Sequence, residues 1–372
     1  MSTTWSHALK YHLTEEGRWL FSASITPPTP LVEAPQGGFL LSKVDFDKPP
    51  ITIGEQVELL RVRGLEVADP AVAEAFISNV GYYRLSGFYK YYLDPNDPQR
   101  EKMRAGVTFD DVVKLYEFDR RLRALLSRAL ERIEISIKSK LSHEAATAHG
   151  AFWLCEPVNF DRGRHAQIIE MIDKYIGDKT VDHQHVFINH FMNKYSNPYP
   201  PCWMMMELFS FGALSKVYKL SKGTIRKSVA DQFGLQHDIL ESWLHSLSFA
   251  RNVCAHHGRV WNKGFTIKPK IPKMYNKVWP DTSQDKLYSV CAVVWHLLSR
   301  IDPASPWPQR LATILDGKPN VTLAAMGFPD DWQERRPWAS AKLAHIEAAP
   351  IDAGDAPSKP ATPSTSGGYA PS

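Results

Sequence analysis

The stretch from Thr108 to His149 constrains the fold of this chain more than any other feature, because it contains neither glycine nor proline. Its apolar side chains recur every three or four residues, the spacing that lines up one face of an α-helix. They are Leu115, Phe118, Leu122, Leu125, Ala129, Ile133, Ile137 and Leu141. At about 1.5 Å per residue such a helix reaches roughly 60 Å. The sequence therefore predicts a long central helix and, with it, an all-α helical bundle.

Further helices are expected before and after this stretch. The segment Thr52–Glu55 has the residues of a capping box, and Asp69-Pro70 combines an N-cap with a proline in the first helical turn. Helical patterns also occupy residues 164–177, 203–221, 238–257 and 284–301. No segment shows a convincing alternation of apolar and polar residues, so no β-strand is predicted.

The chain is expected to have three parts. Residues 1–45 form an N-terminal extension that is punctuated by Thr26-Pro27-Pro28-Thr29-Pro30. Residues 46–340 form the helical domain. In the tail, residues 341–372, the composition shifts to alanine, proline, serine and glycine, which bury too little apolar surface to offset the entropy of ordering, so disorder is predicted there.

Composition excludes several classes of protein. The formal net charge is +4, from 44 Lys+Arg and 40 Asp+Glu, which is too mild to indicate a nucleic-acid partner without local clustering. The four cysteines form no C-x-x-C pair, which fits a reducing cytosol and gives no sign of a disulfide framework or zinc knuckle. We expect a cytoplasmic protein without a signal peptide or membrane helix. No P-loop or G-x-S-x-G elbow is present, and the histidines at 183, 185 and 190 lack metal-site spacing, so neither a cofactor nor a metal is expected.

The segment Arg251–His257 is the strongest candidate for chemistry. Asp238-x-x-Glu241 is interpreted as the cap that begins its helix, and Gly258 as the residue that ends it. On a helical wheel Arg251 falls inside the apolar face, where an unpaired charge is costly, so it needs a partner or a ligand. Asn252 and His256 share a polar face, on which the amide could orient the imidazole.

These residue types suit the cleavage of RNA. An imidazole can take or give a proton near neutral pH, and a guanidinium matches the oxygens of a phosphate. One His256 supplies one proton-transfer group, whereas cleavage by the 2′-hydroxyl needs a base and an acid, so a homodimer is expected. The alternative is that an arginine and a histidine at this spacing occur by chance and merely favour the negative end of the helix dipole. His257 is as consistent with a structural hydrogen bond as with a supporting role.

Basic residues elsewhere are candidate RNA contacts. From Arg259 to Val278 there is no acidic residue, and Trp261, Phe265 and Tyr275 are interleaved with the cations, a composition typical of nucleic-acid surfaces and of solvated loops alike. A second acid-free basic run lies between Lys216 and Lys227. The candidates retained as RNA-binding residues are Arg259, Lys263, Lys268, Lys270, Arg84 and Arg120. Arg84 lies in the tyrosine-rich segment Gly81–Tyr89, a composition found in core corners and in RNA-stacking surfaces.

The chain resembles the Abi-like family of bacterial abortive-infection proteins over about residues 46 to 338. Besides Ile53–Gln56, the resemblance rests on the segments Gly81–Gly87, Asp119–Arg123, Glu131–Glu134, Arg251–Asn262 and Met326–Pro329 with Trp332. The family is related to the HEPN superfamily of ribonucleases, whose motif arginine and histidine correspond to Arg251 and His256. The resemblance implies a helical bundle, a cleft shared by two motifs, metal-independent RNA cleavage and a role in halting the growth of phage-infected cells.

The sequence therefore predicts a HEPN endoribonuclease that acts in anti-phage defence or as a toxin, with Arg251 and His256 as catalytic residues supported by Asn252 and His257. RNA and a second copy of the chain are the expected partners, and an antitoxin is a further candidate. A non-cleaving RNA-binding module that associates with a small regulatory RNA, or a protein-binding phage sensor, would fit the same residues.

Overall fold

The computed structural model describes residues 8–13, 19–24, 49–177, 186–275, 279 and 284–340. The chain divides into two units, Met1–Thr52 and Ile53–Ser372. In the first unit, β1 (Ala8–Leu13) and β2 (Trp19–Ser24) form an antiparallel hairpin in which Ala8 is opposite Ser24 and Leu13 is opposite Trp19. This hairpin was not predicted. Leu9–Leu13 does alternate apolar and polar residues, but Trp19-Leu20-Phe21 is a continuous apolar run without alternation. The predicted disordered tail at 341–372 lies outside the described residues, and the boundaries at 45 and 340 stay predictions.

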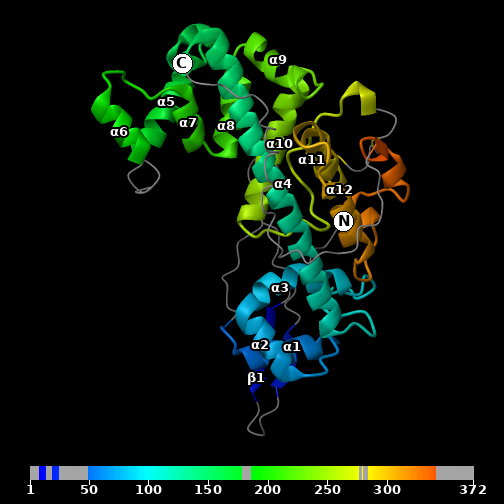
Figure 1. The fold of residues 1–372 in the computed structure, drawn as a ribbon. Helices are drawn as coiled ribbons and strands as arrows, with labels where there is room; N and C mark the ends of the chain where they lie inside the picture. Colours follow the sequence, from blue (N-terminus) through cyan, green and yellow to red (C-terminus); the bar gives the residue numbers. More distant parts are fainter. Residues whose placement is uncertain are drawn as a thin grey trace, which may run out of the picture. The chain divides into compact units, whose positions relative to one another are not determined.

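The predicted long helix is confirmed as α4 (Phe109–His149), which passes through the second unit (Figure 1). Thr108 caps its start: the Thr108 hydroxyl accepts a hydrogen bond from the Asp111 amide, and the Asp111 carboxylate accepts one from the Thr108 amide. Its end is marked by Gly150, whose φ of +87° favours glycine. Every member of the predicted apolar stripe is buried, so α4 is the central element of an all-α fold.

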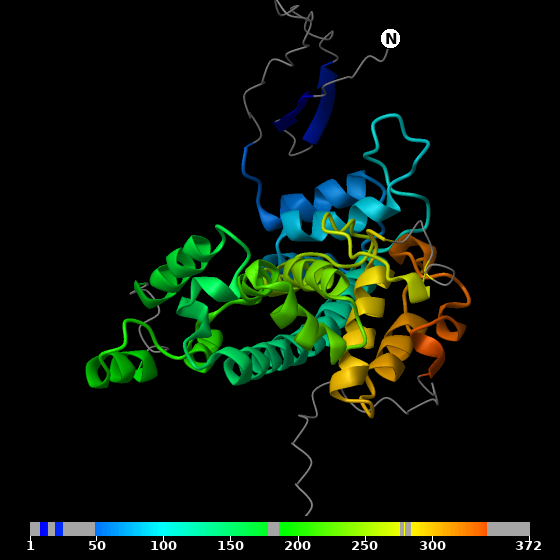
Figure 2. The ribbon, with the colours of Figure 1, turned by 90° about the horizontal axis from the view of Figure 1, so that it is seen from above.

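The other helices described in the second unit precede and follow α4 in the chain. They are α1 (Ile53–Val62), α2 (Pro70–Val80), α3 (Tyr82–Tyr89), α5 (His165–Gly177), α6 (Val186–Lys194), α7 (Cys202–Leu208), α8 (Phe211–Leu220), α9 (Gly223–Asp231), α10 (His237–Ala255), α11 (Leu287–Ile301) and α12 (Trp307–Asp316). Short 3₁₀ turns lie at Lys90–Tyr92, Trp153–Cys155, Pro157–Asn159, Lys273–Tyr275, Ala324–Met326, Trp332–Glu334 and Trp338–Ser340. Helices α3, α7, α9, α10, α11 and α12 all contact α4 (Figure 2).

Two local predictions are wrong, while a third is confirmed. The helix expected over 203–221 breaks into α7 and α8, because Phe209 is extended and buried and the Ser210 hydroxyl caps α8. The expected Asp238-x-x-Glu241 cap is absent: α10 begins at His237, after a Gln236 that makes no side-chain cap bond. By contrast, the Asp69 carboxylate does cap α2, accepting from two amides of its first turn.

Candidate functional site

The candidate motif lies at the C-terminal end of α10, where the chain turns sharply. His256 is the last half-helical residue, and His257 adopts the left-handed conformation with φ of +55°. The Gly258 amide donates to the Val253 carbonyl at 2.7 Å, and the His257 amide donates to the Cys254 carbonyl at 3.0 Å. This is a Schellman motif in which a histidine occupies the position that glycine usually takes. Gly258, which was expected to fill that position, is needed for another reason: a Cβ there would lie 3.1 Å from Val253.

His256 presents its ring to solvent. The side chains of Asn252, His256 and His257 are all exposed. The expected hydrogen bond from Asn252 to the imidazole is not formed among the described residues; the Asn252 amide oxygen instead accepts from Arg251 Nη1 at 3.4 Å. The His256 ring is therefore available for proton transfer with a ligand.

Arg251 is less buried than its place on the helical wheel indicates, and its side chain is 38% exposed. Its Nε lies 3.7 Å from Oε2 of Glu134, a carboxylate of α4 that is only 12% exposed. Lys138 Nζ lies 3.3 Å from the other oxygen of the same carboxylate. Sequence reasoning showed that Arg251 needs a partner, and Glu134 is that partner.

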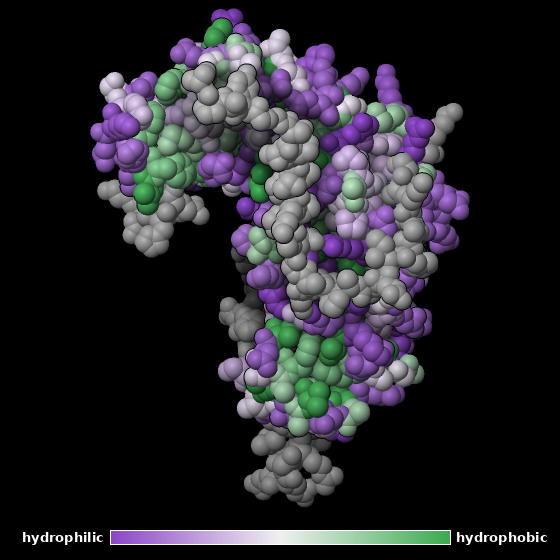
Figure 3. All heavy atoms as spheres, viewed as in Figure 1, coloured by the Kyte–Doolittle hydropathy of each residue, from purple (hydrophilic) through white to green (hydrophobic). Residues whose placement is uncertain are grey.

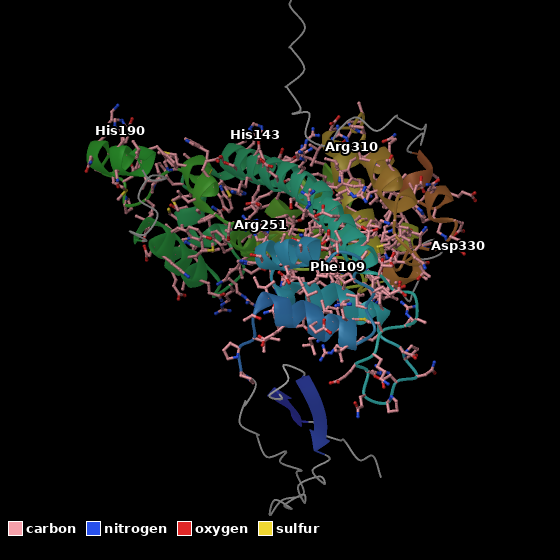
Figure 4. The ribbon with its side chains drawn as sticks, turned by 90° about the horizontal axis from the view of Figure 1, so that it is seen from below. Phe109, His143, His190, Arg251, Arg310 and Asp330 are labelled. Atoms are coloured by element: carbon pink, nitrogen blue, oxygen red, sulfur yellow. The ribbon has the colours of Figure 1, made fainter. Side chains whose placement is uncertain are left out.

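Arg251, which is labelled in Figure 4, forms part of the wall of a small pocket between α10 and α4. The pocket has a volume of about 380 Å³. The other lining residues are Ser127, Glu131, Glu134, Ile135, Lys138 and Ala255. A guanidinium, two carboxylates and an ammonium thus meet beside the helix end that carries His256.

Helix α3 fastens the turn that carries the two histidines. Arg84 Nη1 donates to the His257 carbonyl at 2.8 Å, and Arg259 Nη1 donates to the Gly87 carbonyl. The Arg259 guanidinium also lies over the Trp261 ring. Two of the candidate RNA-binding arginines are thus engaged within the fold.

Asp119 of α4 holds the chain that leaves the motif, a role that sequence reasoning missed. The residue is fully buried, and its Oδ1 accepts from the amides of Val260 and Trp261 at 2.8 and 2.7 Å. Its Oδ2 pairs with Arg123 one turn further along α4. Burial raises the pKa of Asp119, and the two amides and Arg123 oppose that rise. The signal in the sequence was an i,i+4 acid–arginine pair beside the apolar stripe.

The basic segment after the motif is not a base-stacking surface. The rings of Trp261, Phe265 and Tyr275 are all buried, so the expectation that they could stack on bases is wrong. Lys268 and Lys270 are exposed, although Lys270 lies 3.3 Å from Asp238. In this extended segment the apolar side chains face the core, which leaves the lysines toward water.

Other candidate cations have acidic neighbours, on the same helix or on another one. Arg120 lies 2.7 Å from Glu117, and its side chain is 63% exposed. In the second basic run, Arg226 pairs with Glu241 at 2.8 Å, and Lys227 pairs with a carboxylate four residues later. That run contains no acidic residue, but carboxylates from outside it neutralise part of its positive charge.

A larger pocket, of about 800 Å³, lies between α1, α2 and the start of α4. Its walls are mostly apolar, and hydrophobic residues gather on this part of the surface, where Val62 and Val72 are 49% and 61% exposed (Figure 3). No residue of the motif lines it, so its size alone does not make it the candidate site.

The described residues contain neither a candidate metal site nor a helix that could span a membrane. Across the described ranges no three His, Cys, Asp or Glu side chains are grouped so that they could hold a metal ion. His190 lies exposed on α6, whereas residues 183 and 185 fall outside the described residues. None of the described helices is both long enough and apolar enough to cross a membrane.

Residues 75–262, about half of the chain, match the family described as Abi-like protein. The matched range contains the motif and the residues that contact it from α3 and α4, whereas Ile53–Gln56 and Met326–Pro329 lie outside it. No curated protein and no solved structure matches the chain.

Proposed function

Because the chain belongs to the Abi-like protein family, we propose that it acts in abortive infection, against phage or as a toxin, as a metal-independent endoribonuclease of the HEPN superfamily. The observation that carries this proposal is the end of α10, where the solvent-facing ring of His256 stands five residues after a half-exposed Arg251 that lines a polar pocket.

The chemistry follows from these two side chains. His256 removes the proton from a ribose 2′-hydroxyl, whose oxygen attacks the adjacent phosphorus, and the 5′-oxygen leaves with a proton from an acid. The products are a 2′,3′-cyclic phosphate and a 5′-hydroxyl. Arg251, which lines the pocket and whose Nε lies beside Glu134, stabilises the charge that develops on the phosphorane.

Two imidazoles are exposed at this site, those of His256 and His257. Only His256 occupies the position of the motif histidine, whereas the reaction needs a base and an acid. A homodimer that brings two copies of the motif together would supply both, with one His256 on each oxygen.

The lysines that follow the motif in sequence, together with Arg120, are the proposed RNA contacts. Lys263, Lys268 and Lys270 follow it directly, and Arg120 adds a charge from α4. Arg84 and Arg259 act mainly by shaping the motif, because their guanidinium groups donate to backbone carbonyls.

The second candidate is a non-cleaving RNA-binding module that holds a small regulatory RNA or is held by an antitoxin. It is favoured by the fact that, among the described residues, Arg251 already has a carboxylate partner while His256 has no group that orients its ring. A phosphate could displace Glu134 without being cut.

The ends of the RNA products distinguish these functions. The full-length protein is incubated in EDTA with a single-stranded RNA and with the same RNA carrying a 2′-deoxyribose at each cut position. We expect cleavage of the first only, with 2′,3′-cyclic phosphate ends detected by mass spectrometry. Products with 5′-phosphate ends, or cleavage abolished by EDTA, would contradict the proposed mechanism. Binding without cleavage across several RNAs would favour the second candidate.

A further inference from the structure

Tyr83 on α3 has an exposure that its neighbours do not share. Its side chain is 91% exposed, the highest value among the large apolar and aromatic side chains of the described residues that reach the surface. Tyr82 and Tyr89 of the same helix pack against each other and hydrogen-bond through their hydroxyls at 3.1 Å. Within the described part of the chain, the Tyr83 ring makes no hydrogen bond and no ring contact. It therefore contributes little to the fold.

The position of Tyr83 relates it to the candidate site. The next residue, Arg84, donates to the carbonyl of His257, which adjoins His256. Since consecutive Cα atoms are about 3.8 Å apart, the Tyr83 ring stands within a few nucleotides of the reacting phosphate if RNA occupies the motif. Solvent-exposed aromatic residues are common singly and need no explanation, but this one adjoins the arginine that contacts the turn carrying the two exposed histidines.

The backbone that carries Tyr83 is well anchored. The Ser86 hydroxyl donates to the Tyr83 carbonyl at 2.7 Å, and Leu85 and Phe88 are buried on the other face of α3. Arg84 is the helix's one charge, so no carboxylate of α3 itself repels a phosphate. An uncovered ring on an anchored backbone offers a free face on which a nucleic-acid base can stack.

We propose that Tyr83 is such a platform and that the substrate class is RNA with unpaired bases, in single strands or loops. The reason is geometric: in a duplex each base already stacks on its neighbours and offers no free face, whereas an unpaired base can lie on an aromatic ring. This inference rests on the proposed function for the location of the RNA, but it concerns binding and not cleavage.

The test measures binding separately from cleavage. The full-length His256→Ala protein is titrated in EDTA against a fluorescein-labelled single-stranded RNA and against a duplex of the same sequence, with anisotropy as the signal. Tyr83→Ala and Tyr83→Trp are compared in this background. Tyr195→Ala is the matched control, because Tyr195 is also exposed, at 48%, but follows α6. Circular dichroism verifies that each protein is folded.

Loss of one stacked base is worth roughly a 5- to 150-fold change in affinity. We expect Tyr83→Ala to weaken single-stranded binding within that range, Tyr83→Trp to retain it, and Tyr195→Ala to leave it unchanged. Duplex binding should not depend on Tyr83. Equal affinities for Tyr83→Ala and its parent would overturn the proposal, as would an equal loss on the duplex or an absence of RNA binding by the parent.

Wild-type cleavage separates the two proposals. If single-stranded binding depends on Tyr83 but the wild-type protein cuts no RNA, the stacking site stands and the nuclease does not. If the wild type cuts RNA and neither binding nor cleavage responds to Tyr83→Ala, the nuclease stands and the stacking site does not.

Discussion

Replacing Asp119 with asparagine should destabilise the protein far more than an ordinary loss of one ion pair. The carboxylate is fully buried, accepts two backbone amides from the chain that leaves the motif, and pairs with an Arg123 side chain that is only 10% exposed. Asparagine has nearly the same shape and can still accept from Val260 and Trp261. What it removes is the negative charge opposite Arg123.

The magnitude follows from that uncompensated guanidinium. Removing one member of a buried ion pair costs about 3–5 kcal/mol, and a hydrogen bond to a charged group is stronger than a neutral one by about 1 kcal/mol. Because Arg123 is slightly exposed, water reduces the cost of leaving its charge without a partner. We therefore expect Asp119→Asn to lower the free energy of unfolding by about 3 kcal/mol. The chain that follows His256 should also loosen, so RNA cleavage should fall at temperatures where the protein is still folded.

The assay is urea unfolding followed by circular dichroism and by tryptophan fluorescence. Asp231→Asn is the matched control, because Asp231 pairs with Lys227 at the same i,i+4 spacing but with side chains 55% and 68% exposed. It should cost less than about 0.5 kcal/mol. Adding Arg123→Met to Asp119→Asn should recover part of the loss, since the buried charge is then gone. A cost below about 1 kcal/mol for Asp119→Asn, or no recovery in the double variant, would refute this reasoning.

Three further predictions concern other groups of the fold. Glu134→Gln removes the carboxylate beside Arg251 and should lower the rate of RNA cleavage about tenfold, because the guanidinium is then misplaced. Glu144→Gln, on the same helix, is the control, and equal rates of cleavage by the two variants would contradict the role of Glu134. Burial lowers the pKa of His296, so as pH falls below about 6.5 the unfolded imidazole takes up its proton before the folded one does. The free energy of unfolding should therefore fall as pH drops, by at most about 1.4 kcal/mol per pH unit. A pH profile from urea unfolding that runs parallel to that of His296→Gln would be inconsistent with this. Burial raises the pKa of Cys254 to about 11, so iodoacetamide at pH 8 should leave this thiol unmodified in the native protein and alkylate it in urea. Equal labelling of Cys254 in both states, measured by mass spectrometry, would disprove its protection.

The sequence predicts the parts of this structure that depend on local periodicity. Helix α4 forms as expected because a regular apolar stripe runs through a segment without a helix breaker, and all of that stripe is buried. The end of α10 is less predictable. Glycine usually adopts the left-handed conformation that follows a helix end, but here His257 adopts it. Glycine is favoured at position 258 because a Cβ there would lie too close to Val253.

The contacts that shape the candidate site are between segments far apart in the chain, which periodicity does not reveal. Arg84 meets His257, Asp119 meets Val260, and Glu134 meets Arg251. The composition of the basic run after the motif also does not reveal which side chains are buried. Its aromatic residues suggest a nucleic-acid surface, but their rings pack in the core, since burying large apolar side chains is favourable wherever the backbone allows it.

RNA cleavage by matched variants tests the central claim most directly. Wild type, Arg251→Ala, His256→Ala and His245→Ala are compared on single-stranded RNA in EDTA after circular dichroism has shown that all four are folded. His245 is the control because it is an exposed histidine on the same helix, before the motif. The ribonuclease account predicts cleavage by wild type and His245→Ala and its loss in the other two variants. Cleavage that persists in folded Arg251→Ala and His256→Ala would contradict the assignment of these residues.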